Sequence, residues 1–186
     1  GYVVRQRGLI DMTLAAHWPA TRTLGQPWAL LSAPTGDAAA LRLIEQPPTP
    51  GYDPTRSLGW SAIEIAVQDP YSLARSLANT PFRIVVPPRA LPWNADLHAM
   101  QALGPDGELL YFTRLPAEPL VLDLRGARCA VDRAFIAVHG CRDLEATLQF
   151  YRERLGMPTL DGGTTVVQII NERFALPADH LTQLGV

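Results

Sequence analysis

The chain has 186 residues, of which 47% are apolar, and its formal net charge is −2 with a pI near 6.1. This length and apolar content support one substantial domain or two small ones. There is no basic stripe interleaved with aromatic residues, and no apolar run reaches the roughly 18–20 residues that a transmembrane helix needs. We therefore expect neither nucleic acid nor a membrane as a partner.

Two further features of the composition narrow the chemistry. All 16 residues counted as Lys or Arg are arginine, which excludes a Schiff base on lysine and a phosphate-loop lysine. Cys129 and Cys141 lack the CxxC spacing of redox or metal motifs, so we expect reduced thiols. The opening residues 1–5 do not resemble a charged leader before an apolar stretch, which predicts a cytoplasmic protein.

Prolines divide the chain into three blocks, and the first, residues 1–50, contains only predicted strands. Trp28–Leu31 and Ala40–Ile44 predict two strands on either side of a turn at residues 34–37. Residues 10–16 predict a third strand ahead of them. No leading strand and helix are predicted before these elements.

The second block, residues 58–116, has the clearest pattern. Ser61–Val67 predicts a strand with Ile63, Ile65 and Val67 on one face. Asp69 followed by proline predicts the N-cap and first turn of a short helix. Three more strands follow, giving the order β-α-β-β-β. They are predicted at residues 82–86, closed by Pro87 and Pro88, at 97–103, and at 108–114 after a tight turn at 104–107.

The third block, residues 131–186, begins the same pattern again. Residues 134–138 predict a strand, and Asp143 predicts the N-cap of a helix that ends at Gly156. Residues 164–170 predict another strand. The repeat of one unit indicates a complete βαβββ module at 58–116, the back part of a module at 1–50, and the incomplete start of a third at 131–186. We therefore expect a piece of a longer chain.

Three stretches carry motifs that go together: Ile63–Asp69, Gly104–Tyr111 and Asp143–Gly156. They resemble, in that order, the strand that begins a module, the turn into its last strand, and the first helix of the vicinal-oxygen-chelate superfamily, which includes glyoxalases, bleomycin-resistance proteins and extradiol dioxygenases. This resemblance implies an α+β fold in which βαβββ modules pair into curved mixed sheets that form an open cup around a ligand.

The resemblance also implies a metal half-site in each module, with His, Gln or Glu on the first strand and Glu on the last. Such ligands leave open positions on Fe, Mn, Ni or Zn for a substrate with two adjacent oxygens. Counting from the motifs places the first-strand positions on Ala62 and Arg133 and the last-strand position on Tyr111. The usual ligands are missing there, so no metal is assigned and a divalent cation stays an alternative.

Five residues remain as candidates for binding a ligand, and each could equally be an ordinary structural residue. Glu64 lies two residues beyond Ala62, hence on the same strand face, and Glu45 follows the strand 40–44. These two carboxylates are also the candidate metal ligands. The remaining candidates are His98 and Tyr111, on strands that could line the cup, and His17, after a run of small residues.

Three functional hypotheses follow from this interpretation. The leading one is a protein that binds a small organic molecule, with aromatic compounds as candidates, without the metal of the superfamily. The alternative is a metal-dependent lyase, isomerase or extradiol dioxygenase that acts on a small molecule. The third is a scaffold whose cup serves in dimerisation. A homodimer is a candidate partner under all three hypotheses.

Overall fold

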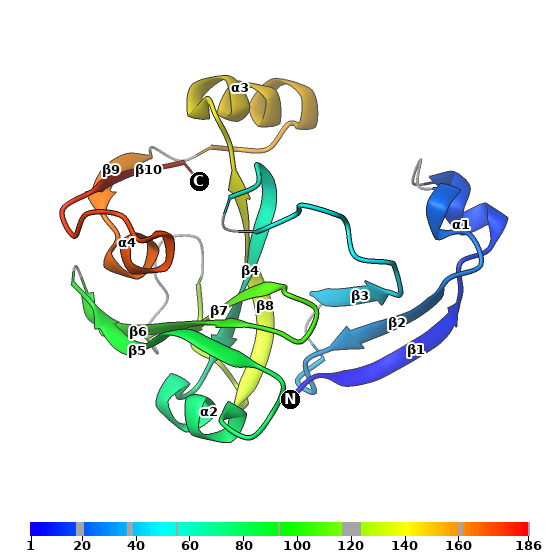
Figure 1. Ribbon diagram of the computed structural model, residues 1–186, viewed down its shortest axis with the longest axis horizontal. Helices are drawn as coiled ribbons and strands as arrows, with labels where there is room; N and C mark the ends of the chain where they lie inside the picture. The colour runs from blue at the N-terminus through cyan, green and yellow to red at the C-terminus, as the bar shows by residue number, and fades with distance from the viewer. Residues whose placement is uncertain are drawn as a thin grey trace.

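The computed structural model describes residues 1–17, 21–36, 39–54, 56–92, 94–116, 124–159 and 162–185. These residues form three sheets, with helices between the strands (Figure 1). The elements are β1 (Val3–Leu9), α1 (Met12–His17), a 3-10 turn (Thr21–Thr23), β2 (Pro27–Ser32), β3 (Ala40–Ile44), β4 (Gly59–Val67), α2 (Pro70–Leu77), β5 (Arg83–Leu91), β6 (Asn94–Leu103), β7 (Leu109–Arg114), β8 (Val131–Gly140), α3 (Leu144–Leu155), β9 (Gly163–Val166), α4 (Gln168–Phe174) and β10 (Leu181–Leu184).

The central sheet has five strands in the order β5-β6-β7-β4-β8. β4 runs parallel to β7, while its other neighbour, β8, is antiparallel. The β-α-β-β-β order predicted for residues 58–116 is therefore observed over β4, α2, β5, β6 and β7. The fold prediction, α+β with mixed curved sheets that do not close into a barrel, is confirmed. Two smaller sheets, β1-β2-β3 and β9-β10, flank the central one.

Helix α2 covers one face of the central sheet, which we call the α2 face. The side chain of Asp69 accepts a hydrogen bond from the backbone N–H of Tyr71, and Pro70 occupies the first turn, as predicted. The core on this face contains buried residues of β4, β6 and β7 packed against Leu73 and Leu77 of the helix. Those buried residues are Ile65, Val67, Met100, Ala102 and Phe112.

Helix α4 packs on the opposite face, which we call the α4 face. Val167 and Ile169 contact Val86 of β5 and Ala99 of β6, and all four are buried. The predicted strand at 164–170 is therefore wrong in its second half, because β9 ends at Val166 and a helix follows. Its β-branched residues favour a strand locally, but burial against the sheet favours the helix. Figure 1 shows α2 and α4 on opposite sides of β5 and β6.

Two other strand predictions are corrected. Residues 12–17 form α1 rather than a strand, because the side chain of Asp11 accepts a hydrogen bond from the N–H of Leu14 (2.7 Å) and so starts a helical turn. β5 does not end at Pro87 but continues to Leu91. β5 is an edge strand, and its pairing with β6 shifts register between Val86 and Arg89. Pro87 and Pro88, which lack a backbone N–H, lie within this shift and therefore interrupt no regular hydrogen-bond ladder.

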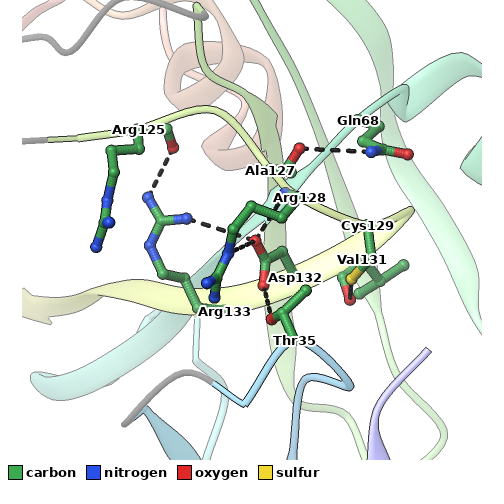
Figure 2. A network of polar contacts seen from close by, with 9 residues as sticks. All are labelled: Thr35, Gln68, Arg125, Ala127, Arg128, Cys129, Val131, Asp132 and Arg133. Carbon is green, nitrogen blue, oxygen red and sulfur yellow. Dashed lines mark hydrogen bonds and ion pairs between the residues drawn. The ribbon is translucent and has the colours of Figure 1, made fainter.

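The buried carboxylate of Asp132 joins the first block of the chain to the central sheet (Figure 2). Asp132 lies on β8 and is 0% exposed. It accepts hydrogen bonds from the hydroxyl of Thr35 (2.5 Å), in the turn after β2, and from the backbone N–H of Arg128 (2.8 Å). The guanidinium groups of Arg128 and Arg133 lie 3.6 Å from the same carboxylate.

This network also explains the charge state of Asp132. Burial by itself would raise the pKa of the carboxyl, but the Arg128 N–H, the Thr35 hydroxyl and the two guanidinium charges together hold it below the ordinary value of 3.8. Arg133 in turn donates to the carbonyl of Arg125 (2.6 Å). Arg133, which the sequence motif places at a metal-ligand position, therefore has a structural role here.

Two structural features bear on expectations drawn from composition. Cys129 and Cys141 are both free thiols, as expected. Among the helices of the described ranges, none is long and apolar enough to cross a membrane. The division of the chain into one complete and two partial modules stays a prediction.

We predict that Asp132→Ala lowers the free energy of unfolding by about 3 kcal/mol, because Arg133 is left as a buried charge without its partner. The matched control, Thr35→Val, removes one hydrogen bond and keeps the ion pairs, so it should cost about 1 kcal/mol. Urea unfolding followed by circular dichroism measures both values. Equal losses in the two variants would show that the carboxylate does not hold this network together.

Candidate functional site

The strand register places three polar side chains in one row across the α4 face. Glu64 on β4 pairs with Tyr111 on β7, and Tyr111 pairs with Gln101 on β6. Side chains alternate between faces along a strand, and the neighbours Ile65 and Met100 belong to the α2-face core. Glu64, Tyr111 and Gln101 therefore project from the same side of the sheet, and we call them the polar row.

Glu64 is a carboxyl group held in an environment that opposes its charge. Desolvation by burial raises its pKa above the ordinary value of 4.5, although the hydrogen bond from Thr113 acts in the opposite direction. Thr113 donates its hydroxyl to Oε1 of Glu64 over 2.6 Å. A carboxyl group with a raised pKa and one remaining oxygen can donate or accept a proton toward a molecule bound beside it.

Tyr111 is the middle residue of the polar row. Burial, and then the nearby charge of Glu64, raise its pKa to about 12, while the positive charge of Arg173 acts to lower it. The phenol is thus neutral over the physiological range and can donate a hydrogen bond to a bound molecule. The electrostatic effect of Arg173 also places the end of α4 close to this tyrosine.

Gln101 is the clearest anomaly in the row. The side chain is 0% exposed, yet neither its amide nitrogen nor its amide oxygen has a hydrogen-bond partner among the described residues. Nε of Arg173 is likewise buried without a partner there. Each unsatisfied buried polar atom costs about 1–3 kcal/mol, so two such groups in one place indicate a missing polar partner.

The polar row is covered at one end and open at the other. On the β5 side, α4 packs over Val86 and Ala99 and is fixed there by a two-pronged ion pair between Glu172 and Arg89. On the β8 side, Ile136 pairs with Glu64 and is 39% exposed. Among these flanking residues, solvent therefore comes nearest to the row on the β8 side.

His98 does not belong to this row. It lies on β6 but faces α2, where Nδ1 is 3.0 Å from the hydroxyl of Tyr71 and the two rings meet edge to face. The expectation that His98 lines the same surface as Glu64 is therefore wrong. An imidazole three positions before Gln101 falls on the opposite face because the side chains of a strand alternate.

The other two candidates lie in the first block of the chain. His17 ends α1, where its Nδ1 is 2.6 Å from the carbonyl of Thr13, and its neighbour Trp18 is outside the described residues. Glu45 follows β3 as predicted and is exposed, with its backbone N–H bonded to Pro27. Neither residue is part of the polar row, and whether either binds a ligand stays a prediction.

The residues of the row do not fit a divalent metal. The row offers one carboxylate, one neutral phenol and one amide, with the cationic Arg173 nearby. Over the ranges that the structure describes, no group of three or more His, Cys, Asp or Glu residues is placed to hold a metal ion. Fe, Mn, Ni and Zn sites use several imidazole, carboxylate or thiolate ligands, so no chemical step is assigned to a metal here.

Sequence reasoning identified two of the three residues in the row and missed Gln101, together with Thr113 and Arg173. Glu64 and Tyr111 were found because motif counting leads to their strands. Gln101 is not part of any recognised motif. The one signal in the sequence is that it lies between Met100 and Ala102 on a strand and therefore projects from the face opposite to theirs. Arg173 was expected to follow a strand, and the helix that brings it over the sheet could not be predicted from local pattern.

Comparison with known proteins supports the fold. No protein-family profile and no curated protein matches the sequence. Among solved structures, glyoxalase I from Zea mays matches with a TM-score of 0.59 at 19% identity, covering 87% of this chain and 49% of that chain. A glutamate-to-glutamine mutant of that enzyme gives a TM-score of 0.58 at 19% identity, covering 90% and 50%. The chain thus shares the glyoxalase fold and spans about half the length of these structures.

Glu64→Gln is predicted to change how stability depends on pH. The pKa of Glu64 is raised in the folded state, so between pH 4.5 and that raised value only the folded state keeps the proton, and stability falls as pH rises. Glutamine cannot ionise, so the variant should gain stability over the parent as pH rises through this window, with no gain below it. Thermal unfolding from pH 4 to 8 measures the difference.

The exposed residue Glu45 supplies the matched control, because Glu45→Gln removes one carboxylate outside the polar row. A Glu64→Gln curve that stays parallel to the parent at every pH would contradict the raised pKa.

Proposed function

We propose that this chain binds a small organic molecule on the α4 face, with the polar row as the group that recognises it. The observation that carries the proposal is Gln101, a fully buried amide with both polar atoms unsatisfied. A bound hydroxyl or carbonyl group would provide the missing partner. Its neighbours in the row, Tyr111 and Glu64, would supply a neutral donor and a carboxyl group to the same molecule.

The chemistry of the row favours a ligand with a polar end and an apolar body. Ala62, Ala66 and Leu109 surround the row on β4 and β7 and are buried, which leaves only a few polar groups to fix the orientation of a ligand. Binding sites for small molecules are commonly lined in this way. Glu64, with its raised pKa, could also transfer a proton to or from the bound molecule, so a reaction by general acid–base catalysis is compatible with the row.

The metal-dependent lyase, isomerase or dioxygenase remains the competing function. It would require ligands other than those of the polar row, because the described residues supply no such set. Metal analysis of the freshly purified protein tests it directly. Stoichiometric Fe, Mn, Ni or Zn that is lost in Glu64→Gln would contradict binding without a metal. The cytoplasmic location and the homodimer stay predictions that belong with this proposal.

Binding is tested with catechol and benzamide, two small aromatic probes that carry hydroxyl or carbonyl groups. We predict that Gln101→Leu weakens the binding of both probes by about tenfold, the effect of losing one well-placed polar contact. The same variant should be as stable as the parent or more stable, since it removes two unsatisfied buried atoms. Saturation-transfer NMR measures binding, and thermal unfolding measures stability.

Gln6→Leu, at an exposed position on β1, is the matched control and should leave binding unchanged. A Gln101→Leu protein that is destabilised by more than about 1 kcal/mol would mean that the amide is satisfied in solution. Failure of both probes to bind the parent, or equal binding by the parent and Gln101→Leu, would contradict the proposal.

A further inference from the structure

An open pocket of about 530 Å³ lies at the end of the central sheet where β6 turns into β7. Four segments line it: the loop before β4, the strand ends at Arg83 and Leu103, the turn at Asp106 and Gly107, and the end of α4 at Arg173. The volume is within the range of about 300–1,000 Å³ that is usual for sites that take small molecules. The resemblance motifs do not account for this pocket.

The pocket is next to the polar row on the same face. Leu103 pairs with Leu109 and lies two residues beyond Gln101 on β6, a step of about 7 Å along a strand. Arg173 belongs to both places, since it lines the pocket and its charge acts on Tyr111. The pocket and the row are therefore the two ends of one surface, with the leucine pair between them.

The charges in the pocket are only partly balanced. Arg56 lies 3.9 Å from Asp53, so these two largely offset each other. Arg83 forms no hydrogen bond or ion pair with the residues that the structure describes, and Nε of Arg173 is buried without a partner there. Asp106 is the other acidic residue of the lining. The lining therefore contains two guanidinium groups, those of Arg83 and Arg173, against the single carboxylate of Asp106.

We propose that Arg83 and Arg173 bind the carboxylate of a small organic acid whose apolar body lies over Leu103. This inference rests on the proposed function, because it assigns a substrate class to the same surface. A guanidinium group matches a carboxylate through two parallel N–H···O bonds, and both arginines line the pocket that the carboxylate would enter.

The balance of charges in the pocket sets the charge that the ligand carries. Because Asp53 is offset by Arg56, the lining leaves Arg83 and Arg173 against Asp106, and one negative charge on the ligand balances this excess, whereas a doubly charged phosphate would exceed it. The ligand class is therefore a monocarboxylate. Its body has to be apolar and short, since about 7 Å separates the Leu103 position from the polar row.

The test compares benzoate with its neutral analogue benzamide and with phenyl phosphate, using the whole chain. Dissociation constants come from NMR titrations that also follow the Nε–H signal of Arg173. We expect benzoate to bind at least about tenfold more tightly than either analogue, and Arg83→Gln and Arg173→Gln each to weaken benzoate by about tenfold. Arg83→Gln should leave the affinity for benzamide unchanged. Arg154→Gln, at an exposed position on α3, is the matched control and should change neither affinity.

The outcomes separate this inference from the proposed function. Equal affinity for benzoate and benzamide, or no effect of either arginine variant, overturns the carboxylate site, and the response of benzamide to Gln101→Leu then decides the proposed function independently. Tighter binding of phenyl phosphate than of benzoate overturns the assignment to a monocarboxylate. Benzoate binding that depends on both arginines but not on Gln101 supports the carboxylate site and counts against the polar row. Arg173→Lys, which keeps the charge but loses Nε, should recover only part of the affinity.

Discussion

The parallel pairing of β4 with β7 is the constraint on which the central sheet depends. Parallel neighbours cannot be joined by a tight turn, so the chain between them must pass through α2, β5 and β6. That crossover buries Ile65, Val67 and Met100 under α2 and leaves the alternate residues on the other face. The same register places Glu64 beside Tyr111. The pairing of β4 with β7 therefore forms both the core on the α2 face and the polar row on the α4 face.

The α4 face of the central sheet buries polar groups at an energetic cost, unlike the apolar core on the α2 face. Gln101 and Nε of Arg173 are buried without partners among the described residues, while Glu64 is desolvated toward its neutral form. A sheet face meant only for packing would carry apolar residues at these positions, as the α2 face does. Natural proteins tolerate such local conflicts mainly at functional sites, which is why the ligand-binding proposal rests on this face.

A buried carboxylate joins the first block of the chain to the central sheet. Asp132 joins the turn after β2 to β8 through Thr35 and compensates the buried charge of Arg133. Counting from the sequence resemblance places Arg133 at a metal-ligand position, but here the arginine contacts Asp132 and donates to a backbone carbonyl. Similarity of fold therefore does not carry over the chemistry of the site, which depends on the residues present.

Local sequence signals were enough to predict the capped helices after Asp69 and Asp143, the strand 61–67, and the turn at 104–107. They also indicated the fold, because the β-α-β-β-β order is a property of the order of elements along the chain. Packing between distant segments, in contrast, determines that residues 168–174 form a helix over the sheet, that β5 continues through Pro87, and that His98 faces α2. These outcomes depend on which strands become neighbours and at which register. Glu64, Tyr111, Gln101 and Arg173 come from four elements, and no local pattern in the sequence records their meeting.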